Sequence, residues 1–366
     1  MTLPFDEKIR STCSSELYDY LVGWRPDATP LGDPNEAAFL HYRLMPRILR
    51  GGGRPDLAVD VLGTASTLPL MVGPFSGDRL FHEDGLRAVV AGARTHGIPV
   101  IISNHTSIPL DELVGDGGDT WLQVGVHEPV DEATDGLDRA ARAGIGTIVV
   151  TAVTPNHYSH RTHPARFNVI DAMNAKGLGT IRRIDPDRRP GSNEPWTWGE
   201  LERFVAMAHE RDLRVVLKGV LHPGDAEMAE DAGCDAVMVS NAGARQLKRI
   251  APSPHQIAPV RAAWGDDRPL LAEGGIRHGS DIIVALALGA DVGVVVRPVA
   301  AGLAAAGQEG VEEVLATLRD ELLGAWSWLG LGALDEVGPH VLHTDAPMAP
   351  LGAGVPPGPP PGGGGG

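Results

Sequence analysis

The sequence has few cysteines and few lysines. Cys13 and Cys234 are the only cysteines in 366 residues, and two cysteines so far apart suggest neither a disulfide framework nor a cysteine-bound metal cluster. This composition is typical of a reducing cytoplasm, where we expect the protein to work. Four of the 31 basic residues are lysines. A lysine at the end of a predicted strand is therefore a candidate site residue.

The sequence also lacks long apolar runs and a surplus of positive charge. No stretch of about 18 apolar residues occurs, and residues 1–6 contain neither the basic nor the apolar region of an export signal. The formal net charge of −16 argues against binding to nucleic-acid phosphates and to anionic membranes. We therefore expect a small-molecule ligand, with no nucleic-acid partner and no membrane partner.

Eight short runs rich in β-branched residues alternate with amphipathic segments. The predicted strands are residues 68–74, 98–104, 121–126, 147–152, 214–220, 236–241, 269–274 and 292–298, and the predicted helices include 83–95, 131–143, 198–211, 223–232, 253–264 and 279–288. This alternation predicts an α/β fold, a (β/α)8 TIM barrel, with its site at the carboxyl ends of the strands. An open doubly wound sheet is the alternative, but no G-x-G-x-x-G follows the first strand.

Three segments lie outside this alternation. Residues 1–66 are predicted to form an N-terminal cap with a helix at 15–23, before a barrel at 67–340. Residues 155–195 form a long connection after the fourth strand, rich in His, Arg and Pro, as is typical of a lid or mobile loop. Residues 341–366 are rich in Pro and Gly and predict a flexible tail.

Charged residues and glycines follow the last strands. Lys218 ends the fifth, residues 273–277 read E-G-G-I-R after the seventh, and Val296 and Arg297 follow the eighth. Loops after strands seven and eight are the usual phosphate site of this barrel, because glycine lets the backbone approach and arginine binds phosphate with two bonds. These residues predict a ligand that bears a phosphate group. A sugar phosphate is one alternative for this ligand.

Residues 240–247 read S-N-A-G-A-R-Q-L. The chain resembles the FMN-dependent α-hydroxy acid oxidases and dehydrogenases, in which this segment reads S-N-H-G-x-R-Q-L. The likeness runs from about Ser15 to Gly338 and is strongest between Leu217 and Pro298. It implies FMN as the cofactor and a homo-oligomer, often a tetramer. Ala242 stands where the family has its catalytic histidine.

The resemblance also implies which residues hold the flavin. Lys218 matches a lysine beside flavin N1 and O2, where its charge stabilises the reduced ring. The other implied contacts are Pro74, Phe75, Ser76, Asn104, Gln123, Thr151, Ser240, Glu273, Gly274, Gly275, Arg277, Val296 and Arg297. Two of them depart from the family, which has aspartate in place of Glu273 and glycine in place of Val296.

An anionic substrate is implied by further matches. Arg245 matches the arginine that binds the substrate carboxylate, and Tyr20 matches an N-terminal tyrosine that reaches the same carboxylate or the substrate oxygen. The family has another arginine in the long loop that closes on this carboxylate. Arg161 is a candidate for it, although counting from Thr151 places His160 there.

Three departures from the family fall on the substrate side of the flavin. Ala242 replaces the histidine base, Val153 replaces the aspartate that orients it, and Gly125 replaces a tyrosine. His105 and His160 are candidates for a relocated base. His157, His160 and His163 are spaced by three, but in a Pro-rich loop this is weak evidence for a metal site, and we predict none.

The missing base bears on the reaction. Oxidation of an alcohol by hydride transfer requires loss of its O–H proton, so loss of the base costs roughly 10²–10⁴ in rate, whereas a neutral amine needs no such deprotonation. The main hypothesis is therefore an FMN oxidoreductase that oxidises or desaturates a nitrogen-bearing, amino-acid-like carboxylate in specialised metabolism. The alternatives are an α-hydroxy acid oxidase or dehydrogenase with a relocated base, and a non-catalytic flavin-binding protein.

Overall fold

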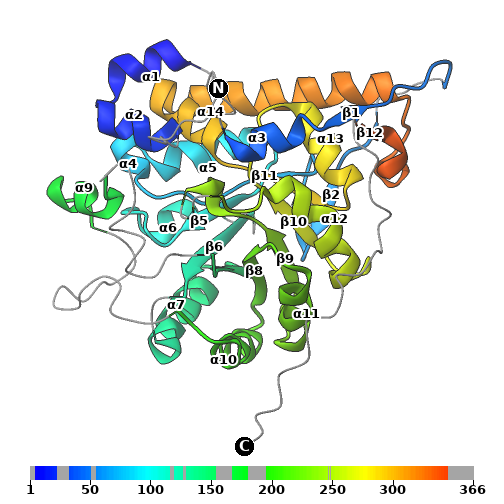
Figure 1. The fold of residues 1–366 in the computed structure, drawn as a ribbon. Coiled ribbons are helices and arrows are strands. Elements are labelled where there is room, and N and C mark those ends of the chain that lie inside the picture. The colour runs from blue at the N-terminus through cyan, green and yellow to red at the C-terminus, as the bar shows by residue number, and fades with distance from the viewer. Residues whose placement is uncertain are drawn as a thin grey trace, which may run out of the picture.

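Eight parallel strands close into a barrel, which confirms the predicted fold and excludes the open sheet (Figure 1). The strands are β4 (Leu70–Val72), β5 (Val100–Ser103), β6 (Thr120–Gly125), β7 (Thr147–Thr151), β8 (Arg214–Val220), β9 (Ala236–Val239), β10 (Leu270–Glu273) and β11 (Val292–Val295). Each pairs in parallel with the next, and β11 pairs with β4. This computed structural model describes residues 5–22, 33–50, 55–115, 119–126, 129–153, 167–179, 195–245, 247 and 249–344.

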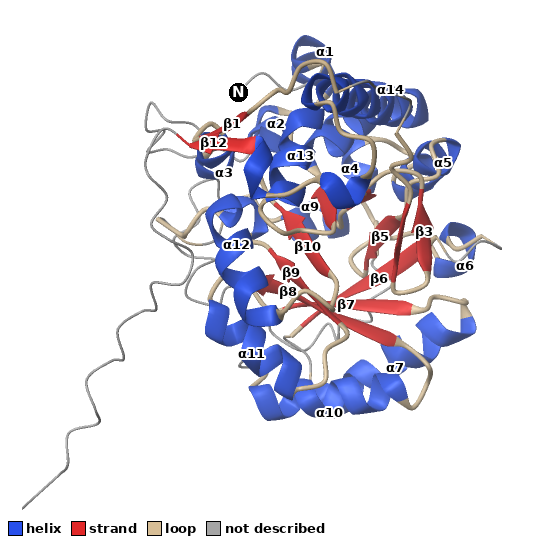
Figure 2. Cartoon of the chain, turned by 90° about the vertical axis from the view of Figure 1, so that its right-hand side faces the viewer, coloured by secondary structure: helices blue, strands red, loops and turns tan. Residues whose placement is uncertain are grey.

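Helices surround the strands (Figure 2). Those that follow barrel strands are α4 (Asp78–Phe81), α5 (Leu86–Thr95), α6 (Leu110–Leu113), α7 (Val130–Arg142), α9 (Val169–Ala175), α10 (Trp198–His209), α11 (Pro223–Asp231), α12 (Ser253–Trp264), α13 (Gly279–Ala287) and α14 (Arg297–Leu329). All six predicted helices are present, with ends shifted by at most three residues. Within the described residues, no helix is long and apolar enough to cross a membrane.

Local signals explain where these helices begin. In α10, Thr197 Oγ1 accepts a hydrogen bond from the Glu200 backbone N–H, and the Glu200 carboxylate accepts one from the Thr197 N–H at 2.7 Å. This capping box satisfies two backbone donors that would otherwise lack partners. The apolar face of α10 then buries Leu201, Phe204 and Val205 against the barrel.

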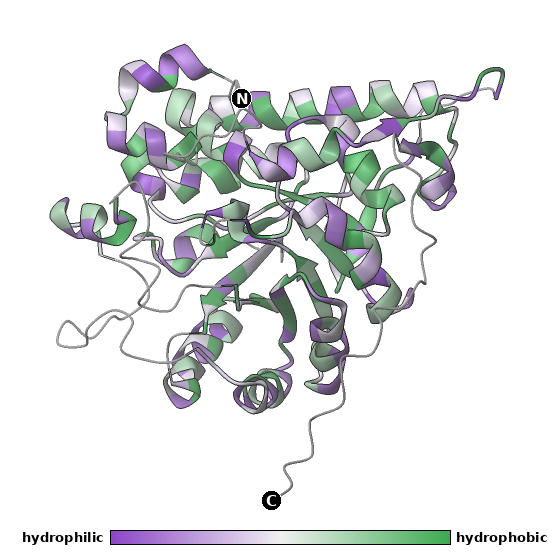
Figure 3. Cartoon of the chain, in the orientation of Figure 1, coloured by the Kyte–Doolittle hydropathy of each residue, from purple (hydrophilic) through white to green (hydrophobic). Residues whose placement is uncertain are grey.

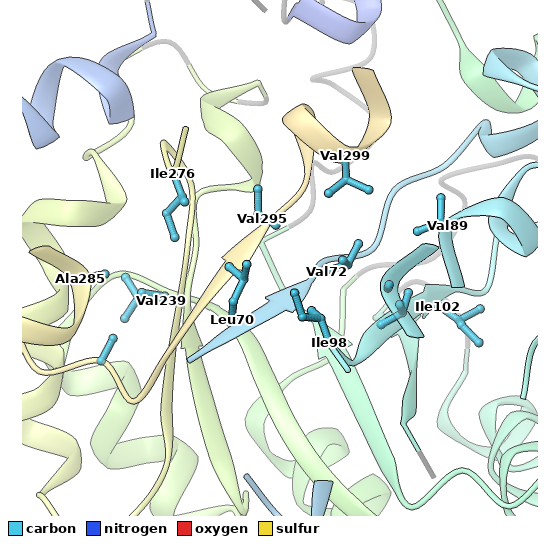
Figure 4. Close-up of a cluster of buried hydrophobic side chains, with 14 of the residues drawn as sticks. Leu70, Val72, Val89, Ile98, Ile102, Val239, Ile276, Ala285, Val295 and Val299 are labelled. Atoms are coloured by element: carbon cyan, nitrogen blue, oxygen red, sulfur yellow. The ribbon is translucent and has the colours of Figure 1, made fainter. Parts of the chain in front are cut away.

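Strand residues alternate between the barrel interior and the helix layer. On β4, Met71 belongs to the interior cluster, whereas Leu70 and Val72 belong to the cluster that packs on the helices. Figure 4 shows part of the outer cluster, with Val72 near Val89 of α5 and Val299 of α14. Apolar residues accordingly fill both faces of the strands, and polar residues gather on the outside of the helices (Figure 3). Such burial on both faces is typical of parallel barrels.

A hairpin closes the amino-terminal end of the barrel. It consists of β2 (Val59–Val61) and β3 (Thr64–Ser66), which pair antiparallel, and Val61 packs on the interior cluster. The indole Nε1 of Trp121, itself 1% exposed, donates to Thr64 Oγ1 at 2.8 Å. Because this end is filled, we expect the ligand site to lie between the carboxyl ends of the strands.

The rest of the N-terminal segment lies against the barrel's helices and its carboxyl end. It contains α1 (Asp6–Thr12), α2 (Ser15–Val22), α3 (Pro34–Phe39) and β1 (Tyr42–Leu44). Strand β1 pairs antiparallel with β12 (Leu342–Thr344), after short 3-10 helices η2 (Leu334–Glu336) and η3 (Pro339–Val341). Residues 342–344 therefore belong to the fold, and the prediction of a tail from 341 was wrong for them; residues 345–366 lie outside the described residues.

The eighth strand and the long connection also differ from expectation. Strand β11 ends at Val295, and Arg297 and Pro298 form the first turn of α14, because proline is well suited to the start of a helix. Helix α9 lies within the connection 155–195, for which we predicted no helix. The division at residue 66 between cap and barrel stays a prediction.

Helix α14 folds back on itself at a kink. Ala306 and Gly307 leave helical geometry, with Gly307 at φ 59° and ψ −134°. Gly302 and Gly310 face each other across this kink, and a Cβ on Gly310 would lie 2.1 Å from the Gly302 carbonyl oxygen. The two halves approach this closely only because both residues lack a side chain. Neither the helix nor its kink was predicted, and the kink depends on a contact that is tertiary.

Gly310→Ala should therefore destabilise the protein. The new methyl group would meet backbone rather than a movable side chain, so we expect a loss of about 1–3 kcal/mol or more in the free energy of unfolding. Gly324→Ala in the same helix is the control, because its Cβ would meet no atom within 4 Å, and alanine there should stabilise by about 0.5–1 kcal/mol. Urea unfolding of both variants tests this, and equal effects would contradict the close approach.

Candidate active site

A cavity opens at the carboxyl ends of the strands, opposite the β2–β3 hairpin. The empty space between its lining residues, including the part open to solvent, is about 930 Å³. Most predicted site residues line it: Tyr20, Pro74, Phe75, Ser76, Gln123, Thr151, Lys218, Ala242, Arg245, Glu273, Gly274, Gly275, Arg277, Val296 and Arg297. The barrel thus brings residues far apart in the sequence to one place.

Five predicted residues of the described chain are not part of the cavity lining: Asn104, His105, Gly125, Val153 and Ser240. Two of them, His105 and Ser240, contact residues that do line it. Ser103 lines the cavity and its neighbour Asn104 does not, and the flavin contact implied for Asn104 stays a prediction. The remaining predicted residues, His157, His160, Arg161 and His163, lie outside the described residues.

Lys218 and Glu273 form a buried ion pair at the barrel mouth. The Lys218 Nζ lies 2.6 Å from Glu273 Oε1, and the two residues are 5% and 6% exposed. The Ser240 hydroxyl donates to the other Glu273 oxygen. Burial of a lone charge is costly, so this pairing keeps the ammonium group in the cavity wall. A flavin ring lying over Lys218 would gain a cation at the edge that becomes negative on reduction.

Two arginines converge at the other end of the cavity. Arg297 donates to the carboxylate of Asp33 and, at 2.8 Å, to the Gly243 carbonyl, and Arg277 lies 3.4 Å from the same Asp33 oxygen. Burial opposes ionisation of Asp33, but the charges of Arg297 and Arg277 hold its pKa below the usual value. Sequence reasoning missed Asp33. The Asp33-Pro34 pair marks a helix start, but nothing in it indicates arginine partners 244 and 264 residues away.

The backbone after β9 follows an unusual path. Residues 242–244 all have positive φ, at 51°, 68° and 56°, and two of them are alanines, which rarely adopt this conformation. Asn241 holds the turn: its side chain exchanges two hydrogen bonds of 2.8 Å with Asn35 and accepts one from the Ala244 N–H. Neither asparagine was predicted as a site residue. The turn carries Ala242 and then Arg245 into the cavity.

Arg245 is held by an aromatic ring rather than by an acid. Its guanidinium lies over the Tyr20 ring, 4.4 Å from the centroid, and no carboxylate of the described residues lies in ion-pair contact with it. Burial is the main reason that its pKa falls to about 10. An anion bound in the cavity would restore the electrostatic stabilisation that burial removes.

Ser76 and His105 form a pair at the cavity wall. The His105 Nδ1 lies 3.2 Å from Ser76 Oγ, and Ser76 lines the cavity. His105 itself does not line the cavity. The Ser76 hydroxyl therefore connects the His105 ring to the cavity.

The cavity fits FMN by its unpaired polar atoms and by its glycines. The buried Thr151 Oγ1 has no hydrogen-bond partner although it lines the cavity, and such an atom normally has one. Gly274 and Gly275, with φ of 111° and 90°, line the cavity and pack closely against Asn35, where a Cβ on either glycine would lie within 3 Å of that residue. Lys218 and Thr151 would face the flavin ring, and Arg277 and Arg297 its phosphate.

Known proteins agree with this site. The family model described as FMN-dependent dehydrogenase matches residues 9–344. The chain is 33% identical over 341 residues to 4-hydroxymandelate oxidase of Amycolatopsis orientalis, covering 90% of this chain and 93% of that protein. It is 30% identical to L-lactate oxidase of a Nostoc strain, covering 93% and 96%.

Solved structures give the same result. A structure of mandelate oxidase with benzoyl-formic acid superimposes with a TM-score of 0.79 and 32% identity, covering 93% of this chain and 96% of that one. The family match, the identities and the barrel together confirm the resemblance and the cofactor. The chain belongs to the FMN-dependent dehydrogenase family and is an FMN-dependent oxidoreductase.

Proposed function

We propose that the protein oxidises a 2-hydroxy acid, with its base supplied by residues other than Ala242. One observation carries the proposal: Arg245 presents a partly buried guanidinium, stacked on Tyr20 and unpaired with any described carboxylate, in the same cavity as Lys218. Such a group suits a substrate carboxylate. The relatives are named as oxidases of 4-hydroxymandelate, lactate and 2-hydroxy acids, which supports this alternative over a nitrogen-bearing substrate.

Arg245 and Tyr20 would bind and orient the substrate. The guanidinium offers two parallel N–H donors to a carboxylate, and the ring of Tyr20 limits the directions in which Arg245 can point. When bound, FMN supplies the acceptor for a hydride from the substrate carbon. The carboxylate anchor sets which hydrogen faces that acceptor, because orientation of the reacting atoms lowers the barrier.

The hydroxyl proton requires a separate route. Ser76 Oγ would accept the proton of the substrate hydroxyl while its own proton passes to His105 Nδ1, 3.2 Å away. The substrate then loses one hydride and one proton, and His105 holds the proton until solvent takes it. A neutral imidazole is a suitable base near neutral pH. His160, the other candidate, lies outside the described residues.

Ala242 favours a substrate with a large side chain. It lines the cavity with a methyl group where the resembled family has the larger side chain of histidine. We therefore include an aryl-substituted 2-hydroxy acid such as mandelate among the proposed substrates.

A substrate panel tests the reaction. Anaerobic mixing of the flavin-loaded protein with mandelate, lactate and a set of amino acids should bleach the flavin absorbance with the hydroxy acids, because the Ser76–His105 pair would supply the base that a hydroxy acid requires. Bleaching by amino acids alone would overturn the proposal in favour of oxidation next to nitrogen. No bleaching by any member would favour a non-catalytic flavin protein.

Variants of the pair test the proton route. Ser76→Ala and His105→Gln should each slow flavin reduction by a hydroxy acid roughly 10²–10⁴-fold, with substrate affinity nearly unchanged, because Arg245 remains. The control is His209→Gln, at a surface histidine that contacts Asp235. Stopped-flow absorbance measures the rates. Normal reduction in both pair variants would exclude the relay.

A further inference from the structure

The phosphate end of the cavity already contains a carboxylate. Asp33 is 5% exposed in its side chain, lines the cavity and pairs with both Arg277 and Arg297. Its other oxygen, Oδ1, accepts a hydrogen bond from the Asn35 N–H at 2.9 Å, which caps α3. The loop before α3 thus directs a negative charge to the place where the two arginines would hold the phosphate of FMN.

The charges at this end are nearly balanced before any ligand binds. Arg277 also lies 2.7 Å from Glu36, so that two guanidinium groups face two carboxylates. A phosphate arriving here must share or replace an existing partner. The phosphate therefore gains less binding free energy than it would from two unpaired arginines. The new ion pairs with the phosphate only replace ion pairs with carboxylates, and such an exchange contributes little net free energy.

The same end is also narrower than the family pattern implies. Val296 stands where the resembled family has glycine, and a methyl group of its side chain would lie 2.7 Å from a Cβ placed on Gly73. Val296 therefore projects from the end of β11 toward the adjacent end of β4. A larger side chain and arginines that already have a carboxylate partner thus lie at one end of the cavity.

We propose that Asp33 is a cofactor-affinity determinant: its carboxylate competes with the phosphate of FMN for Arg277 and Arg297. The chain should then bind the flavin mainly through contacts with the flavin ring. Its Kd for FMN should be only slightly lower than its Kd for riboflavin, which lacks the phosphate. Asp33 is not a catalytic residue, since it pairs with the arginines that would hold the phosphate and would lie away from the reacting atoms. The proposal concerns binding alone and does not depend on which substrate is oxidised.

Asp33→Asn tests the competition. Asparagine is as good a helix cap as aspartate, so the hydrogen bond to Asn35 and the fold should persist while the charge is removed. Removing a like charge beside the phosphate should tighten FMN binding roughly tenfold or more, and the Kd for riboflavin should stay the same. Equilibrium dialysis of the full chain against each flavin measures both constants.

The control is Asp320→Asn, which removes the same charge from the exposed face of α14. It should change neither constant. As a second readout, inorganic phosphate should raise the thermal midpoint of flavin-free Asp33→Asn protein more than that of the parent protein. Weaker FMN binding in Asp33→Asn would show that Asp33 instead preorganises the arginines, and equal changes for FMN and riboflavin would also overturn the proposal.

Discussion

Closure of the barrel between β11 and β4 is the constraint on which the rest of the structure depends. The pairing of Val295 with Val72 completes the ring, and only a complete ring brings all eight strand ends within reach of one ligand. The interior cluster around Met71 and Trp121, together with the β2–β3 hairpin, fills the opposite end. Lys218, Thr151 and the glycine loop therefore share one cavity that opens in one direction.

Within that cavity, the turn after β9 places Arg245 at the cost of an unfavourable backbone conformation. A left-handed alanine costs about 1–2 kcal/mol, and both Ala242 and Ala244 adopt this conformation. The hydrogen bonds between Asn35 and Asn241 offset this cost. The histidine that the family carries at this turn is absent, but the turn still delivers Arg245 into the cavity. This arrangement agrees with the proposed reaction, in which Arg245 would bind the substrate and a residue other than Ala242 would take the proton.

Local pattern predicts the strands, most of the helices and part of the site. Continuous β-branched runs indicate strands buried on both faces, and α12 begins and ends at the predicted residues. Strand-end motifs likewise place Lys218 and Arg245 in the cavity. The kink of helix α14 could not be predicted, because it depends on Gly302 meeting Gly310 in space. Asp33 was missed for the same reason: the fold alone brings it to arginine partners that lie more than 200 residues away.

A double-mutant cycle on Ser76 and His105 tests the central claim most directly. The rate of flavin reduction by a 2-hydroxy acid would be measured for the parent protein, Ser76→Ala, His105→Gln and the double variant. If the two residues form one proton route, the double variant should be no slower than either single variant, because groups that act as a unit are strongly non-additive. Losses that multiply would contradict the relay and would mean that the two side chains act separately.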